Sequence, residues 1–177
     1  GLKYPDDHIA GAIGRDFLRR FRVTLDYAAK TLTLARAGGA PSEGIPFGLA
    51  SVILVEGQIG DQSVGKFVID SSSYTPGAMD AKFVAEEIGK SLFSPDVKRI
   101  NEGPYLFKFT MPSLKVAGAE FLNFSATAVD LRTMAQHIGV NVRGVIGLSL
   151  LRQCRVVIDF KNQRMSMTKI AAPAPAP

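Results

Sequence analysis

Two stretches near the start of the chain alternate apolar and polar residues. In the first, Phe21, Val23 and Leu25 share one face, and residues 31–34 alternate in the same way. Alternation of this kind is typical of a strand with one buried face, and the polar segment 26–30 between the two stretches predicts a turn. We therefore predict a β-hairpin whose apolar face packs on the rest of the chain or on a neighbouring chain.

Most of the remaining pattern also predicts short strands. Gly60-Asp61 separates two of them and favours a hairpin, and Tyr105, Phe107 and Phe109 alternate along one face of another. The predicted strands are 51–59, 63–69, 105–109, 121–129, 145–146, 155–160 and 165–168.

Two short helices are predicted among these strands. Asp80 is a favourable N-cap for a helix over 81–88, and Gly139 ends a second helix over 131–138. Many short strands with one or two short helices predict a mainly β protein, antiparallel and closed like a barrel.

A segment near the start of the chain returns near its end. Gly11-Ala12-Ile13-Gly14 reappears as Gly144-Val145-Ile146-Gly147, and the match continues without a gap into the apolar alternation that ends each copy. We call the spacing from Gly11 to Gly144 the repeat interval. A unit of this length is a domain, because solenoid repeats have periods of about 20–50 residues.

This duplication divides the chain into four parts. Residues 1–36 are expected to be the C-terminal hairpin segment of a first lobe whose front part is not in this sequence. The stretch 37–44, with Gly, Pro and Ser and no hydrophobic pattern, is expected to be a linker. Residues 45–170 are expected to form one complete lobe, and the Ala-Pro tail 171–177 to be disordered.

The composition narrows the classes of function. Apolar residues make up 46% of the chain, enough for a core, but no apolar run reaches the roughly 20 residues of a membrane helix. The formal net charge is +5, yet the basic residues are scattered and no basic run contains aromatic residues. No nucleic-acid partner is therefore expected.

Neither a disulfide nor a metal site is expected. Cys154 is the single cysteine and occupies the repeat position of Phe21, which favours a small buried hydrophobic residue over a nucleophile. His8 and His137 have no cysteine or carboxylate at a metal-ligand spacing, and no glycine-rich phosphate loop is present. No metal ion or cofactor is predicted.

The clearest chemical signal is a carboxylate at the end of an apolar strand. Residues 67–69 are apolar and lead into Asp70, which Ser71, Ser72 and Ser73 follow. Burial of an unpaired carboxylate is costly, so Asp70 has either hydrogen-bonding partners or a function. A serine hydrolase is excluded, because the chain has no Gly-x-Ser-x-Gly motif and neither histidine has a triad context.

Together these residues resemble the retropepsin-like aspartic proteases, the pepsin-type fold family that includes retroviral proteases. In that family an apolar strand leads into Asp-Thr-Gly or Asp-Ser-Gly, and two hydrophobic residues followed by glycine later cross beside it. Asp70-Ser71-Ser72 resembles the first motif and Val145-Ile146-Gly147 the second. The segments after Gly14 and Gly147 resemble the closing helix and hairpin of bacterial two-lobe members, so the resemblance covers most of residues 9–168.

The resemblance implies two carboxylates, one from each lobe or subunit, that share a proton. Asp70 would be one of them, and its partner would come from the first lobe or from a second subunit, as in a homodimer. Asp26 and Asp159 lie in the hairpins, where a structural role is favoured. The residues that would support the motif are Ser71, Ser72, Ser73, Val145, Ile146 and Gly147. The family has glycine where this chain has Ser72, which adds bulk where the two halves approach each other.

Three functions stay open from the sequence. The first is an aspartic endopeptidase-like protein that acts on a peptide or protein substrate, bacterial and periplasmic or secreted. The second is a catalytically degenerate lobe that binds peptides or dimerises, and the third is a structural lobe that stabilises an active first lobe. An increase in activity on replacing Ser72 with glycine separates the first function from the second.

Overall fold

The computed structural model describes residues 13–36, 38, 41–60, 63–75, 77–90, 98–102 and 105–170. Some of the predicted features lie outside this description. They are the Ala-Pro tail, residues 11 and 12 of the repeat, and the side chain of Tyr105. The helices are α1 (Arg15–Leu18), α2 (Ala81–Glu87), α3 (Arg132–Ile138) and α4 (Leu148–Leu151). The strands are β1 (Phe21–Asp26), β2 (Thr31–Arg36), β3 (Ile45–Leu49), β4 (Ile53–Ile59), β5 (Ser63–Ile69), β6 (Gly77–Asp80), β7 (Lys98–Glu102), β8 (Tyr105–Val116), β9 (Ala119–Val129), β10 (Gly144–Ile146), β11 (Cys154–Asp159) and β12 (Arg164–Lys169).

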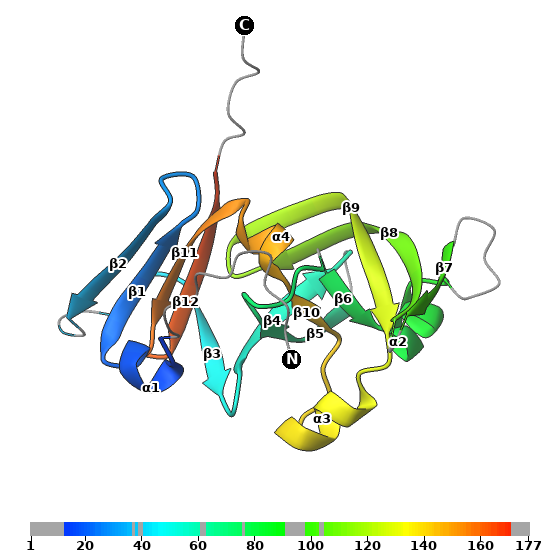
Figure 1. Cartoon of the computed structure of the whole chain (residues 1–177), viewed down its shortest axis with the longest axis horizontal. Helices are drawn as coiled ribbons and strands as arrows, with labels where there is room; N and C mark the ends of the chain where they lie inside the picture. The colour runs from blue at the N-terminus through cyan, green and yellow to red at the C-terminus, as the bar shows by residue number, and fades with distance from the viewer. Residues whose placement is uncertain are drawn as a thin grey trace, which may run out of the picture.

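Six of the strands close into a barrel, on the right in Figure 1. β4, β5, β10, β6, β9 and β8 are hydrogen-bonded in that order, and β8 pairs back with β4. The neighbours are antiparallel except for β5 with β10 and β6 with β9, which run parallel. The structure confirms the predicted class: mainly β, with a closed barrel and few short helices.

The predicted N-terminal hairpin joins a four-stranded antiparallel region beside the barrel, on the left in Figure 1, with the order β2-β1-β11-β12. β1 pairs with β11 in a register that runs from Arg22 opposite Asp159 to Asp26 opposite Arg155. The hairpin therefore packs on the rest of the chain, which is one of the two packings predicted. β3 connects this region to the barrel, because it pairs with both β12 and β4.

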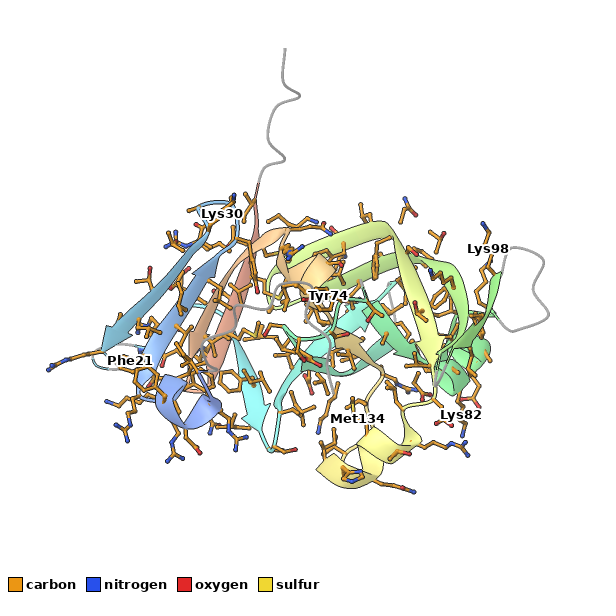
Figure 2. The ribbon with its side chains drawn as sticks, viewed as in Figure 1. Phe21, Lys30, Tyr74, Lys82, Lys98 and Met134 are labelled. Atoms are coloured by element: carbon orange, nitrogen blue, oxygen red, sulfur yellow. The ribbon has the colours of Figure 1, made fainter. Side chains whose placement is uncertain are left out.

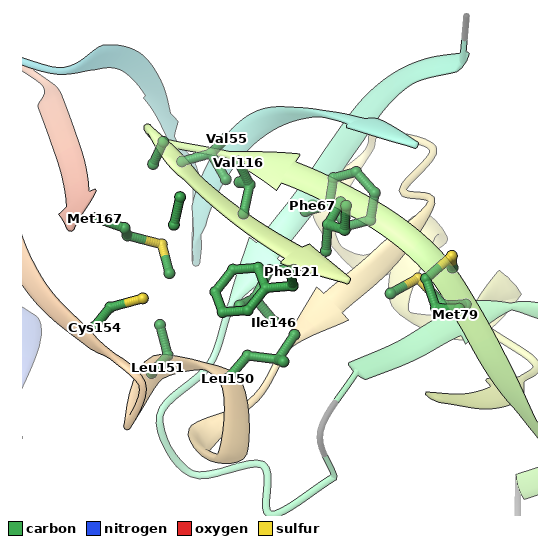
Figure 3. Packing of buried hydrophobic residues seen from close by; sticks show 14 of the residues in the cluster. Val55, Phe67, Met79, Val116, Phe121, Ile146, Leu150, Leu151, Cys154 and Met167 are labelled. Carbon is green, nitrogen blue, oxygen red and sulfur yellow. The ribbon is translucent and has the colours of Figure 1, made fainter. Parts of the chain in front are cut away.

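One hydrophobic core runs from the barrel into the four-stranded region. Figure 3 shows Phe121 and Ile146, from two barrel strands, close to Leu150 of α4, and Phe67 of β5 belongs to the same core. Cys154 lies in the same core and is fully buried, as its repeat position predicts. Each large side chain buried in this way stabilises the fold by about 1.5–3 kcal/mol.

Local signals place several elements correctly. The side chain of Asp80 accepts a hydrogen bond from the backbone N of Phe83 at 3.1 Å and caps α2. Gly139 ends α3 with a φ of +68°, a conformation that glycine adopts without steric cost. Phe107 and Phe109 are both buried, as the alternation along β8 predicts.

The two repeated segments, 13–36 and 146–169, have the same backbone geometry where each begins. Gly14 precedes α1 with φ −83° and ψ 167°, and Gly147 precedes α4 with φ −89° and ψ 176°. The backbone hydrogen bonds that follow each glycine join equivalent positions in the two segments. We call the two segments the first and the second closing unit, each a short helix followed by a hairpin.

The hairpins of the two closing units also match. β1 and β11 begin and end at equivalent positions of the repeat, as do β2 and β12, and the two hairpins have the same register. Each has one residue in the left-handed conformation just before its second strand, Lys30 at φ 54° and Gln163 at φ 51°. The duplication read from the sequence is therefore a duplication of structure.

Candidate functional site

Asp70 lies directly after β5, at the point where β5 runs beside β10. The backbone N of Asp70 donates a hydrogen bond to the backbone O of Ile146 at 3.1 Å, which continues the parallel pairing of Ile69 with Ile146. The structure thus brings together the two predicted motifs, which lie far apart in the sequence. The side chain of Asp70 is partly exposed, while Val145 and Ile146 are buried and serve packing.

The loop after Asp70 folds back onto its carboxylate. Asp70 Oδ1 accepts two hydrogen bonds from Ser72, one from the backbone N at 2.8 Å and one from Oγ at 2.6 Å. Because a carboxylate oxygen has two lone pairs, Oδ1 is fully engaged, and a reaction at this carboxylate would have to use Oδ2. The hydrogen bond from Ser72 Oγ to Asp70 Oδ1 depends on the loop conformation, and the sequence alone did not predict it.

The same loop is fastened to the start of α4. Ser73 O accepts a hydrogen bond from the backbone N of Leu148 at 2.7 Å, and Ser149 Oγ donates to the backbone O of Tyr74 at 3.0 Å. Ser73 Oγ also lies 2.9 Å from Thr75 Oγ1. Sequence reasoning singled out neither Thr75 nor Ser149, although both are small hydroxyl residues close to the predicted motifs. Ser73 is therefore a structural residue of the loop, and Tyr74, which is labelled in Figure 2, is exposed.

Gly147 allows the crossing of the two motifs. A Cβ atom at this position would lie 2.0 Å from the backbone O of Thr75 and 2.7 Å from that of Ser73. Neither backbone oxygen is able to give way as a flexible side chain would, so only glycine fits. The close approach of the two segments therefore requires glycine at this position, while the role of Gly147 in a catalytic motif stays a prediction.

A cavity of about 380 Å³ opens beside Asp70 and Ser71. It lies between the barrel and the two closing units, and its lining is mostly apolar: Leu18, Val23, Ile53, Ile69, Met134 and Leu151 are among its residues. Arg15 also lines it and donates a hydrogen bond to the backbone O of Ala50. Of the described residues that line this cavity, Asp70 is the only carboxylate.

A larger cavity, of about 970 Å³, lies elsewhere on the barrel and does not include Asp70. It is lined by the start of β5 and by residues of α2 and α3. Arg143 and Phe83 both line it, with the guanidinium of Arg143 4.7 Å from the centre of the Phe83 ring. The side chain of Arg143 occupies the space that a Cβ atom on Gly65 would need.

Asp159 and Asp26 lie in the closing hairpins, as expected, and neither lines the cavity beside Asp70. Asp159 is buried and accepts hydrogen bonds from Arg22, Asn162 and the backbone N of Ser42. Burial raises the pKa of Asp159, but the hydrogen bonds from these three residues outweigh that effect and lower it to about 2. Asp159 therefore holds the first closing unit and the predicted linker onto the second closing unit.

Two further features of the described chain bear on its chemistry. Among the residues that the structure describes, no three His, Cys, Asp or Glu side chains are grouped so as to hold a metal ion. No helix in the same part of the chain is long and apolar enough to cross a membrane.

Comparison with known proteins finds similarity among solved structures. No family model matches the chain, and no curated protein matches it either. Among solved structures, the chain is similar to the retroviral protease-like domain of Ddi1 from Leishmania major, with 16% sequence identity and a TM-score of 0.40. The similarity covers 66% of this chain and 96% of that one.

Proposed function

We propose that this chain is part of an aspartic endopeptidase-like protein, in which Asp70 supplies one of two catalytic carboxylates. The observation that carries the proposal is the position of Asp70: at the end of β5, hydrogen-bonded to Ile146 beside the glycine crossing, and open to an apolar cavity. This is the arrangement that the resemblance to retropepsin-like proteases implies.

The chemistry needs a second carboxyl group close to Asp70. One carboxylate takes a proton from a water molecule, whose oxygen attacks the carbonyl carbon of the peptide bond. The other carboxyl group donates a proton to the carbonyl oxygen, and a proton reaches the nitrogen as the C–N bond breaks. The pair shares one proton at the start of the reaction because two charged carboxylates at contact distance repel each other.

A cleavage assay on the polypeptide in its natural length tests this proposal. Peptide-library cleavage would be followed from about pH 3 to pH 7, with and without a pepstatin-type inhibitor. We expect cleavage that Asp70→Asn abolishes and that Glu86→Gln, at an exposed carboxylate of α2, leaves unchanged. The same assay on the 177-residue chain reports whether two copies supply both carboxylates. Cleavage that survives Asp70→Asn would refute the proposal.

A second candidate is a degenerate lobe that binds peptides without cleaving them. The bond from Ser72 Oγ to Asp70 Oδ1 favours it, because this hydroxyl occupies an oxygen of the carboxylate and adds a side chain beside it. In that case library peptides bind with an affinity that Asp70→Asn changes, and no cleavage product forms. We further propose a periplasmic or secreted location, which fractionation of the source cells tests.

A further inference from the structure

The cavity of about 970 Å³ takes no part in the proposed function. Residues of α2 and α3, the start of β5 and residues 140–143 line it, and we call it the α2–α3 cavity. No described residue lines both this cavity and the one beside Asp70. Small-molecule sites have volumes of about 300–1,000 Å³, so the space is sufficient for a ligand of that class.

Most charged side chains of this lining are engaged with one another or with the backbone. The described lining has four cations and four carboxylates, so its formal charge is balanced. Lys82 pairs with Glu86 at 3.9 Å, and Arg132 Nε donates a hydrogen bond to Asp130 Oδ1 at 2.9 Å. Asp80 accepts the capping hydrogen bond of α2. The charged side chains that remain decide which ligand charge the cavity favours.

Two cations of the lining, Lys66 and Arg143, lie on adjacent backbones without a carboxylate partner. The backbone N of Arg143 donates a hydrogen bond to the backbone O of Lys66 at 2.8 Å. Glu56 stands opposite Lys66 in the β4–β5 register. Within the described part of the chain, however, neither cation forms an ion pair or a side-chain hydrogen bond. Two unpaired cations at adjacent positions of a concave surface attract an anion.

The neighbours of Arg143 hold its side chain in position. A Cβ atom on Gly65 would lie 2.1 Å from Cγ of Arg143, so the arginine stem lies directly over the glycine. The guanidinium stacks on Phe83, which is 1% exposed. A stacked guanidinium keeps its N–H edge free, and this edge matches the two oxygens of a carboxylate. Because the side chain is already in position, it loses little conformational entropy when a ligand binds.

The rest of the described lining, apart from Asn141, is apolar or glycine. Val64, Leu106 and Val140 are among these residues, so the cavity offers apolar surface to the body of a ligand. The carboxylates of the same lining disfavour a doubly charged ligand, because like charges repel each other. The surroundings therefore suit a single negative charge on an apolar body.

From these contacts we propose that the α2–α3 cavity binds a monoanionic organic acid. Its carboxylate accepts hydrogen bonds from the guanidinium edge of Arg143 and from Nζ of Lys66, and its apolar body lies against Val64, Leu106 and Val140. The site is independent of the proposed function, because neither Asp70 nor the cavity beside it contributes a residue.

Calorimetric titration of the 177-residue chain with octanoate tests this site. Octanamide has the same apolar chain without the charge, acetate has the charge without the chain, and inorganic phosphate tests for a phosphate site. We expect octanoate to bind with a Kd of about 1 mM or lower, and the other three compounds at least roughly tenfold more weakly. Octanamide that binds as well as octanoate, or octanoate that does not bind, would overturn the proposal. Phosphate that binds more tightly would overturn it in favour of a phosphate site.

Two variants test the contact with Arg143. Arg143→Gln should weaken octanoate binding roughly tenfold, because a charge-assisted pair of hydrogen bonds is lost. Gly65→Ala should also weaken it, because the added Cβ atom displaces the stem of Arg143 without a change in charge. Arg155→Gln, at an exposed arginine of β11, is the control and should leave the Kd unchanged. A Kd that neither cavity variant changes would overturn the proposal.

Amide chemical shifts measured by NMR locate octanoate on the wild-type chain. Residues 81–87 and 140–143 should shift on titration, whereas Ile53 and Leu151, which line the cavity beside Asp70, should not. Shifts confined to the cavity beside Asp70 would overturn the location of the site. Octanoate binding at the α2–α3 cavity without peptide cleavage would refute only the proposed function.

Discussion

Asp159 and Asp26 hold equivalent places in the two closing units, but their surroundings differ. Each accepts a hydrogen bond from a backbone N in the turn that follows it, from Asn162 at 3.1 Å and from Ala29 at 2.9 Å. Asp159 alone is buried, and it also binds Arg22, whose Nη2 lies 3.1 Å from its Oδ2. The same turn residue has thus become, in one copy, the buried end of an ion pair between the two units.

Replacing Asp159 with asparagine should destabilise the protein by about 2 kcal/mol at neutral pH. Its folded pKa, about 2, lies below the unfolded value near 4, so the ionised group stabilises the fold above about pH 4. That stabilisation is lost as the pH falls from about 4 toward 2, and the difference between wild type and variant should halve by about pH 3. Urea unfolding of both proteins at several pH values measures this difference in the free energy of unfolding. Asp26→Asn is the control, and an Asp159→Asn effect that did not change with pH would contradict this account.

Ser72 determines how much of the Asp70 carboxylate is free to react. In the natural-length polypeptide, Ser72→Gly should raise kcat/KM for peptide cleavage by roughly tenfold, because it removes both the hydroxyl bonded to Oδ1 and the side chain beside it. Ser72→Ala removes the hydroxyl but keeps the Cβ atom, so it separates the two effects. Cleavage that neither variant increases would show that the side chain of Ser72 does not limit the reaction, and the absence of cleavage by wild type and by both variants would favour the peptide-binding candidate.

At the scale of single elements, the two glycines that precede α1 and α4 form a matched pair. Both have extended backbones and neither helix has a side-chain cap. A Cβ atom on Gly14 meets nothing within 4 Å, whereas one on Gly147 lies 2.0 Å from the backbone O of Thr75. The geometry of the residue is the same, and only the neighbouring loop differs.

Gly147→Ala should therefore destabilise the protein by about 3 kcal/mol, because the Asp70 loop must move away from α4. Gly14→Ala should cost about 1 kcal/mol or less, the effect of alanine at a helix N-cap. Thermal unfolding of the two variants against wild type gives both values. Equal losses of stability in the two variants would show that the close approach at Gly147 does not affect the free energy of unfolding.

Elements with a local signal were predictable, and those that depend on distant partners were not. The hairpins follow from alternation, and the ends of α2 and α3 from Asp80 and Gly139. The pattern of apolar and polar residues contained no strand signal for β3, which includes Pro46 and Gly48. It contained none for β6 either, a short strand that forms between β10 and β9. β7 was missed as well.

The candidate site shows the same division. Asp70 and Gly147 each stand in a short contiguous motif, so the sequence was sufficient to single them out. The hydroxyl bond of Ser72 and the hydrogen bond from Arg15 to Ala50 depend on how loops are folded in space. No spacing along the chain encodes either contact.

At the scale of the whole molecule, the first closing unit is part of the same core as the barrel. Val23 of β1 is 2% exposed and packs in the hydrophobic cluster that contains Cys154 of β11. We therefore expect the hairpin and the barrel to unfold together.

Thiol labelling of Cys154 measures whether the hairpin and the barrel unfold together. Burial raises the pKa of Cys154 to about 11, so its thiol is unreactive in the folded protein near pH 8. Val23→Ala should destabilise the fold by about 2 kcal/mol and thus raise the labelling rate by roughly a factor of thirty. Thr33→Ala, at an exposed position of β2, is the control. A labelling rate that Val23→Ala leaves unchanged would show that the hairpin opens independently.

The residue-for-residue match of the two closing units has a consequence for how such a chain gains or loses a lobe. Val23 and Val156 occupy the same place in the two units, so joining Val23 directly to Val157 deletes one full repeat interval. The strand across the junction keeps its alternation, and the hairpin keeps its register. A single recombination between the copies thus removes one whole barrel and leaves an unbroken closing unit at the C-terminal end. The reverse exchange adds a barrel, and neither event requires a new strand pairing to evolve.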